Sequence, residues 1–416
     1  MTTITATLSG CFGRRRLIGQ ALAALLIAVL ALPAMGMSIK ERNQLDLSKY
    51  TVNDPNASYF DVPARMKLLQ QTENPMLLTQ VEELSTGPSC QQLLAIPPLD
   101  TEIRIPGFYP SPKAWRKISG PLFQFEKAVA KLAGAYVTSG DVYYGRCLIR
   151  FLDKWAQHDA LLNFYYESSQ PQAWFSTESM IFSAAEAYSV VRPAVDGMDE
   201  EKQRVNQWLR DLAYKHKAIP GQPNNSCCNN HFYRRALYAS MVGVLTDDDE
   251  LFRFGVSAIY SALHDLTKKG ALPLEMKRGR RASHYQNYAL LYLIPNLQIV
   301  SRQGYDVFNL EVDGHTIKDA VNFAIDILED PDKLGDLAPH EQYKGFLKDD
   351  QYLAWMEIYL SHFDEPRLEQ FLRTMRPIEN RGAGGYVTLY FMDPAAQQQA
   401  FTAAQKRRAR TFQNQK

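Results

Sequence analysis

Apolar residues recur at helical spacing along most of this chain, with charged residues at the positions between them. The first long helix is predicted to begin after Gly120 and Pro121, because apolar residues then fall at i, i+4, i+7 and i+11. These residues are Phe125, Val129, Leu132 and Tyr136. We expect Gly140 to end this helix and Asp141 to cap a second one that runs through Trp155.

Further segments with the same spacing follow, and the loops between them contain Pro193, Pro220 and Gly270. The predicted helices cover 173–191, 200–216, 231–246, 248–267, 285–304, 316–328, 350–362 and 365–374. One segment, 384–391, has the pattern of a short strand. Helix hairpins that pack one on the next favour an all-α fold, an incomplete α/α toroid (α/α barrel) with a central groove.

The first 36 residues have the pattern of a signal peptide rather than of a folded element. Three arginines at 14–16 precede an apolar stretch at 17–32, and Ala34-Met35-Gly36 forms a small-residue cleavage site. We therefore expect export to the periplasm. A twin-arginine signal and an uncleaved membrane anchor are the alternatives that these residues leave open.

Residues 37–395 are predicted to form a single helical domain. It begins with a proline-punctuated, loop-rich arm that extends to about Pro106 and contains short helices at 64–71 and 77–84. The end of the chain, 396–416, is rich in Gln, Lys and Arg, and we expect it to be a solvated basic tail.

The composition is that of a globular protein with a large core. Of 416 residues, 46% are hydrophobic and 22% are charged, and the formal net charge is only +1. A chain without a global basic field is not expected to bind nucleic acid, so any attraction to a polyanion must be local.

Two stretches gather side chains that can move protons or bind anions. In 224–236, Asn230 and His231 stand just before an apolar helical run. In 272–290, a basic run at 277–281 precedes a tyrosine-containing helix start. Taken singly, these features also fit a helix cap with a half-buried histidine, a solvated basic face and core tyrosines.

Together, an amide, an imidazole, a guanidinium and a phenol suit β-elimination in a 4-linked uronic acid chain. Removal of the C5 proton builds negative charge beside a carboxylate, which strong donors must first neutralise. A base then takes the proton, and an acid protonates the departing O4. In β-mannuronate and β-glucuronate the proton and O4 lie on the same side of the ring, so one hydroxyl, such as that of Tyr285, can serve as base and then acid.

The motifs Asn-Asn-His-x-Tyr at 229–233 and Leu-Pro-x-Glu-x-Lys-Arg at 272–278, followed by Tyr-x-Asn-Tyr-Ala-Leu at 285–290, carry a resemblance to a known family. They resemble the periplasmic mannuronate-specific alginate lyases, polysaccharide lyase family five, whose toroidal fold is thereby implied as well. The resemblance implies catalytic roles for four residues, the first three neutralising the carboxylate and the last serving as acid and base. These are Asn230, His231, Arg278 and Tyr285.

The chain departs from the family after the histidine, where Phe232-Tyr233-Arg234 replaces the usual Ser-Tyr-Trp. The lysine-containing lid of the family has no clear equivalent, since 106–117 is rich in proline and aromatic residues instead. The choice of substrate therefore stays open between polymannuronate and a glucuronate-containing exopolysaccharide.

Seven further residues are candidates for substrate contact: Gln172, Trp174, Tyr233, Lys277, Arg281, His284 and Tyr288. Of these, Arg281 is expected to provide a second cation, and a charged His284 to lower the pKa of the neighbouring phenol. Glu275 and Lys277 are expected to form an ion pair that fixes their loop.

Four cysteines remain once Cys11 leaves with the signal, and they allow three pairings in an oxidising compartment. The family resemblance implies a disulfide between Cys90 and Cys147. The adjacent Cys227 and Cys228 fit either a vicinal disulfide or two buried thiols. No metal-ligand spacing is present, and neither a metal nor a cofactor is expected.

Two other classes of function compete with a lyase. An inverting glycoside hydrolase needs two separated carboxylates, for which Glu275 with Asp349 or Asp350 are the candidates. A binding or scaffold protein needs no chemistry at all. The predicted partner is an anionic polysaccharide, and an exopolysaccharide export complex is a second candidate.

Overall fold

Helices make up the regular secondary structure of the described residues, and β pairing is limited to isolated bridges. The computed structural model describes residues 36–108, 110–167 and 172–396. The predicted signal peptide up to residue 35 and the basic tail from residue 397 lie outside these ranges.

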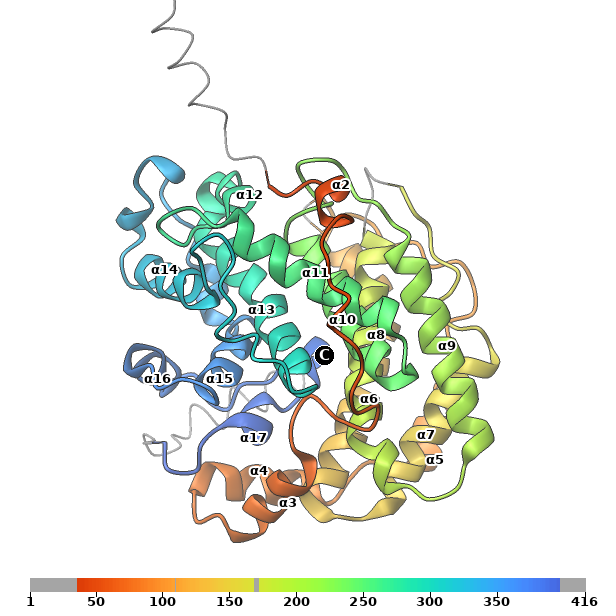
Figure 1. Cartoon of the computed structure of the whole chain (residues 1–416). Coiled ribbons are helices and arrows are strands. Elements are labelled where there is room, and N and C mark those ends of the chain that lie inside the picture. Colours follow the sequence, from red (N-terminus) through yellow and green to blue (C-terminus); the bar gives the residue numbers. More distant parts are fainter. Residues whose placement is uncertain (1–35, 109, 168–171, 397–416) are drawn as a thin grey trace, which may run out of the picture. The chain divides into compact units, whose positions relative to one another are not determined.

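Short helices come first in the described residues, a run of long helices follows, and most of the 3-10 turns lie in the later part of the chain (Figure 1). The longer helices are α6 (Pro112–Ser139), α7 (Val142–Gln157), α8 (Gln172–Val191), α9 (Asp199–Lys217), α10 (Asn230–Thr246), α11 (Asp249–Asp265), α13 (Ala282–Ser301) and α14 (Ile317–Glu329). The shorter helices are α2 (Ile39–Arg42), α3 (Val62–Gln71), α4 (Pro75–Ser85), α5 (Cys90–Leu94), α12 (Pro273–Met276), α15 (Ala354–Leu360), α16 (Pro366–Leu372) and α17 (Val387–Phe391). The 3-10 turns are η1 (Arg192–Ala194), η2 (Gly279–Arg281), η3 (Pro331–Leu337), η4 (Gly345–Lys348), η5 (Asp350–Leu353) and η6 (Arg381–Ala383).

Helices that follow each other in the chain also pack on each other, and α10 lies among four of the longer helices. It packs against α8, α9, α11 and α13, while α6 packs on α7 and α8, and α13 packs on α15. Because α10 is enclosed, its side chains are buried on every face from Phe232 to Leu245. This succession of packed helix pairs is the predicted α/α toroid.

Most predicted helices are confirmed to within a few residues, but the beginning of α6 is not. The helix begins at Pro112 and continues through Pro121, the residue after which it was expected to start. Proline is well tolerated in a first turn, as at Pro112. Aromatic contact across the interior proline, between Trp115 and Phe123 at 5.5 Å, holds the two parts of the helix together.

The strand predicted over 384–391 is also wrong. Gly384 and Gly385 have φ values of 81° and 95°, which make a turn, and α17 follows. Tyr390 of this helix stacks on Phe60 at 4.7 Å. Among the described residues, the β pairing of this segment is limited to the bridge between Asn380 and Gly385, and packing overrides its β-type composition.

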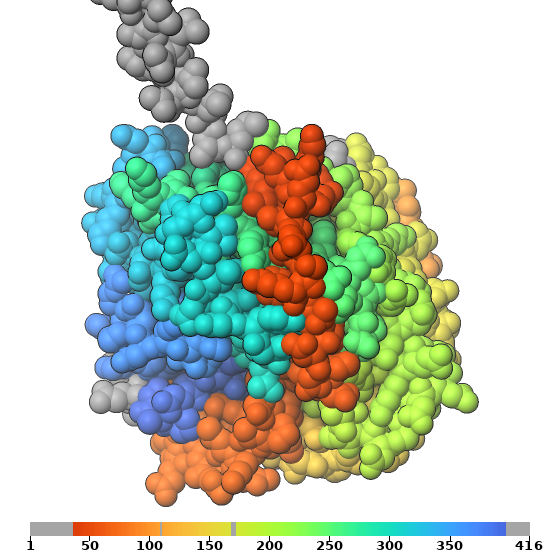
Figure 2. Space-filling model, viewed as in Figure 1, coloured from red at the N-terminus to blue at the C-terminus, as the bar shows by residue number. Residues whose placement is uncertain are grey.

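The N-terminal arm is held against the helices by specific contacts, and its first part crosses one face of the molecule (Figures 1 and 2). Gln303 holds it through the backbone N–H groups of Asn53 and Asp54, at 2.8 and 2.9 Å. Farther along, Cys90 and Cys147 form a disulfide between α5 and α7, the pairing that the resemblance implied. Among the described residues, no helix combines the length and apolar character needed to cross a membrane.

Candidate active site

One buried carboxylate joins the two motif segments. Glu275 of α12 is 0% exposed, and its Oε1 accepts hydrogen bonds from the backbone N of Asn230 at 2.7 Å and from Nδ2 at 3.1 Å. Its Oε2 accepts from the same Nδ2 at 3.0 Å and lies 3.9 Å from Nε of Arg278. The predicted ion pair between Glu275 and Lys277 is wrong. Lys277 is exposed, and the ion pair is made at i, i+3 by Arg278.

The start of α10 fixes His231. Asn229 is the N-cap of this helix, and its Oδ1 accepts a hydrogen bond from the backbone N of His231 at 3.0 Å. The preceding loop contains a disulfide between Cys227 and Cys228, which resolves the choice that the sequence left open. The backbone of His231 is therefore held by the N-cap hydrogen bond and preceded by a disulfide-bonded loop.

His231 is half-buried and lies beside two aromatic rings, Phe175 at 4.8 Å and Trp174 at 5.8 Å. Burial lowers the pKa of His231 to about 3, with further lowering by the positive charges of Arg235, Arg278 and Arg234. The imidazole is therefore neutral at neutral pH, and Arg278 provides the positive charge beside it. As a neutral ring it can donate one hydrogen bond or accept a proton.

Arg278 and Tyr285 stand on either side of η2, and their side chains come together. The guanidinium carbon of Arg278 lies 4.5 Å from the centre of the Tyr285 ring. Nη2 of Arg278 is buried and has no hydrogen-bond partner among the described residues. A guanidinium with such an uncommitted donor, placed over a half-buried phenol, is suited to receive an anion beside that phenol.

The four predicted catalytic residues are therefore neighbours. Glu275 links Asn230 to Arg278, Arg278 covers Tyr285, and the charge of Arg278 acts on the ring of His231. Residues separated by more than fifty positions in the chain thus meet where α10, α12 and α13 begin.

Trp174 and Gln172 lie at the beginning of α8. Trp174 is buried beside His231, and its ring lies 5.4 Å from the guanidinium carbon of Arg235. Oε1 of Gln172 accepts a hydrogen bond from Nε1 of Trp115 at 3.1 Å, which fixes the amide.

His284 is enclosed by aromatic rings rather than positioned as a cation. It stacks on Tyr288 at 5.8 Å and contacts Tyr285 edge-on at 5.2 Å. Burial lowers the pKa of His284 to about 4, and the charge of Arg281 lowers it further. The proposal that a charged His284 tunes the phenol is therefore wrong. Arg281 itself lies 4.7 Å from the ring of Tyr343.

Tyr233 is placed behind the site and not in it. Its side chain is 2% exposed and belongs to the main core. Burial raises the pKa of this phenol well above its usual range, and the charges of Asp265 and Glu275 add to the effect. The reason is the enclosure of α10, which leaves that face of the helix no access to solvent.

Sequence reasoning missed a second buried charge cluster beneath the site. Arg234 lies 3.9 Å from the ring of Phe175, and its Nε is 3.8 Å from Oε2 of the completely buried Glu178. Arg235 is also buried and donates to the carbonyl oxygen of Ser226 at 3.2 Å. The signal in the sequence is the pair of arginines that interrupts an apolar helical run, and the sequence alone does not show that they are buried.

Glu275, one of the carboxylates proposed for a glycoside hydrolase, is not placed for that role. Both oxygens of Glu275 are occupied by Asn230, and the side chain is fully buried. Burial raises the pKa of Asp350 to about 7, helped by the charges of Asp349 and Glu379. A hydrolase needs an acid and a base that reach the sugar, and Glu275 does not meet that requirement.

An α/α toroid that holds a phenol among anion-binding amide and guanidinium groups has the features of a polysaccharide lyase. Comparison with known proteins gives the family. The alginate lyase family model matches residues 62–334, and the chain belongs to that family.

Individual relatives agree with this assignment. A polysaccharide lyase of Stenotrophomonas maltophilia is 27% identical over 342 residues, covering 79% of this chain and 96% of the relative. An alginate lyase of Azotobacter vinelandii is 28% identical over 291 residues, covering 68% and 76%.

Solved structures show the same fold. Alginate lyase A1-III from Sphingomonas species A1 superposes with a TM-score of 0.77 at 31% identity, covering 84% of this chain and 100% of that one. A variant of alginate lyase A1-III complexed with a tetrasaccharide gives a TM-score of 0.76 at 31% identity, covering 84% and 99%.

Proposed function

We propose that this lyase cleaves a 4-linked β-D-uronate polymer, polymannuronate in alginate above all, by syn β-elimination. The observation that carries the proposal is the position of Arg278, which contacts Glu275 on one side and the ring of Tyr285 on the other. The relatives named as alginate lyases, and the tetrasaccharide bound to one of them, support the choice of substrate.

The substrate carboxylate is neutralised first. Arg278 provides the positive charge, and its uncommitted Nη2 provides a donor. His231 is neutral and donates from one ring nitrogen, while the buried Asn230 on the same turn has its Nδ2 bonded to Glu275. Oδ1 of Asn230 is buried and has no hydrogen-bond partner among the described residues, so it can accept from a protonated uronic acid. Hydrogen bonds that strengthen as charge develops stabilise the transition state.

Tyr285 then moves the proton. The phenolate oxygen takes the C5 proton, the C5 electron pair forms the double bond to C4, and the C4–O4 bond breaks. The same phenol returns its proton to the departing O4, which leaves an unsaturated uronate end and a free hydroxyl. Arg278, beside the ring, stabilises the phenolate that starts the cycle.

The sequence also supports a cellular compartment for this activity. A chain with a signal-peptide pattern that cuts an anionic polymer fits turnover of exopolysaccharide in the periplasm.

Product analysis on a panel of purified polymers tests the function. Polymannuronate, polyguluronate, polyglucuronate and a neutral glucan are incubated with enzyme, and ultraviolet absorbance of the unsaturated end is compared with the yield of reducing ends. We expect both signals to rise together on polymannuronate. Reducing ends without absorbance would identify a hydrolase, binding without either signal would identify a binding protein, and absorbance on polyglucuronate alone would move the substrate to glucuronate polymers.

A further inference from the structure

We propose that the chain is processed between Gly36 and Met37, and that the α-amino group released on Met37 forms a buried ion pair with Asp265. This inference rests on the export expected from the sequence and not on the elimination chemistry.

The peptide bond between Gly36 and Met37 lies directly against the carboxylate of Asp265. The backbone N of Met37 donates a hydrogen bond to Oδ1 of Asp265 at 2.6 Å. Both residues are buried, Met37 being 6% and Asp265 8% exposed. A Cβ added to Gly36 would lie 2.7 Å from Oδ2 of the same carboxylate, so a larger residue does not fit there without displacing it.

Asp265 stands where a carboxylate is unfavourable. It is the last residue of α11, and the C-terminal end of a helix carries partial negative charge that disfavours an anion. Burial raises the pKa of Asp265 to about 6, and the charge of Glu41 adds to this. A buried carboxylate whose donor is a neutral amide is poorly compensated, and a cation in the donor position would correct that.

The charged groups around Asp265 have other partners. Nη1 of Arg42 donates to the carbonyl oxygen of Cys227 at 2.9 Å. His264, which also lowers the pKa of Asp265, binds Asp313 through Nδ1 at 2.5 Å. The phenol of Tyr233 also faces Asp265, and its pKa is raised well above its usual range, so it brings no positive charge.

Hydrolysis would supply the missing cation without moving the chain. Water adds across the C–N bond, Gly36 leaves with the new carboxylate, and the nitrogen of Met37 becomes an amino group. With an ordinary pKa of about 8, that group takes a proton at neutral pH, and a carboxylate at hydrogen-bond distance favours the charged form. Ala34 and Gly36 are the small residues that a signal peptidase requires at the third and first positions before the cleaved bond.

The anchored terminus also supports the active site. Ser38 caps α2 in a capping box with Glu41, so this short helix follows directly from the anchor. Its Ile39 packs against Cys227 and Cys228, in the loop before α10, and against Leu274 of α12, next to the two catalytic motifs.

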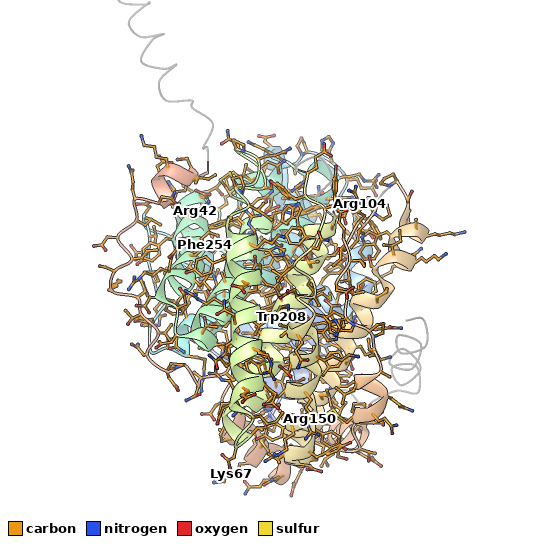
Figure 3. The ribbon with its side chains drawn as sticks, turned by 90° about the vertical axis from the view of Figure 1, so that its right-hand side faces the viewer. Arg42, Lys67, Arg104, Arg150, Trp208 and Phe254 are labelled. Atoms are coloured by element: carbon orange, nitrogen blue, oxygen red, sulfur yellow. A yellow bond between two sulfur atoms is a disulfide. The ribbon has the colours of Figure 1, made fainter. Side chains whose placement is uncertain are left out.

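Arg42, at the end of α2, lies 3.5 Å over the ring of Phe232, which in turn contacts Phe254 at 5.6 Å. Figure 3 shows Arg42 and Phe254 at the same end of the molecule. Phe232 follows His231 directly, so α2 contacts the turn that fixes the imidazole through Arg42.

Two measurements test the inference. First, the full chain is expressed with export, and the exported protein is examined by intact mass and N-terminal sequencing. We expect Met37 as the first residue. A first residue at any other position overturns the ion pair, and an exported protein that still begins at Met1 overturns the expected processing as well.

Second, a double-mutant cycle combines a change of the first residue with removal of the charge on Asp265. Proteins that begin at Met37 or at Met35 are released from a cleavable fusion, each with and without Asp265→Asn, and urea unfolding is measured. With the Met37 start, D265N is expected to lower the folding equilibrium constant about tenfold or more, the effect of one pKa unit of interaction. With the Met35 start the loss should be much smaller.

Equal losses in the two lengths would overturn the proposal. Asp46→Asn, which neutralises an exposed carboxylate of the N-terminal arm, is the matched control and should show no dependence on chain start. If D265N fails to fold in one length, acylation of the α-amino group at neutral pH decides instead. A Met37 amine in an ion pair reacts more slowly in the folded than in the urea-unfolded protein, and equal rates would contradict the pair.

Discussion

Arg278 lies with its guanidinium carbon 4.5 Å from the centre of the Tyr285 ring, while its Nε lies 3.9 Å from the buried carboxylate of Glu275. The same cation is thus held from within the protein and presented to a phenol near the surface. In the proposed mechanism, this arrangement places a cation where the carboxylate of the substrate binds.

Replacement of Arg278 should impair binding and chemistry together. We expect Arg278→Ala to raise KM for polymannuronate and to lower kcat by about a hundredfold or more, because it removes a donor that acts on developing charge. Arg278→Lys restores the charge but not the planar fork, so it should recover KM better than kcat. Unchanged KM in the alanine variant would place the substrate carboxylate elsewhere.

Ionisation of Glu275 should shape the acid limb of the activity profile. Burial raises the pKa of Glu275 to about 7, although Arg278 and the hydrogen bonds from Asn230 oppose the shift. When Glu275 is protonated its hold on Arg278 weakens, so kcat/KM should fall as pH decreases through about 7. Glu275→Gln should be less active and should lack this inflection. An identical inflection in the variant would assign it to another group.

The same group predicts a slope in stability. The pKa of Glu275 rises from an ordinary 4.5 to about 7 on folding, so the folded state binds more protons than the unfolded state between these values. The stability associated with protonated Glu275 is therefore present at low pH and is lost as pH rises through this window. Urea unfolding of the wild type and of Glu275→Gln across that range measures it. The stability of the wild type minus that of the variant should fall as pH rises through this window, and an increase would reverse the sign.

His284 should influence packing and not titration. Because its pKa is lowered to about 4 by burial and by Arg281, His284 stays neutral over the working range of the enzyme. His284→Phe keeps an aromatic ring beside Tyr288, so the pH–rate profile should keep its shape. A displaced basic limb in this variant would return His284 to a role in tuning the phenol.

The sequence contained enough information for the helical toroid and for the four residues that meet at the site. Helical periodicity is a local property, and the motifs kept the spacing between Arg278 and Tyr285. The ion-pair partner of Glu275 was predicted wrongly. Lys277 and Arg278 are equally plausible on charge alone, and only the turn of α12 places Arg278 beside the carboxylate. Tyr233 was misplaced for a related reason, since helical spacing does not reveal how many neighbours enclose α10.

Titration was the least predictable property. His231 and His284 stand in basic sequence surroundings, and whether such a histidine is charged depends on burial and on arginines that the fold brings near. Arg234 and Arg235 contribute to the field at His231 from the same helix, one turn along. The sequence shows these arginines, but the placement of their charges near His231 is a result of packing.

The most direct test of the account is turnover by Tyr285→Phe. The variant keeps the ring that Arg278 covers and removes only the hydroxyl, so oligomannuronate should bind as it does to the wild type. The rate of formation of the unsaturated end should fall by about a hundredfold to ten-thousandfold, as expected when a general acid–base is removed. Wild-type turnover by Tyr285→Phe would contradict the proposed mechanism.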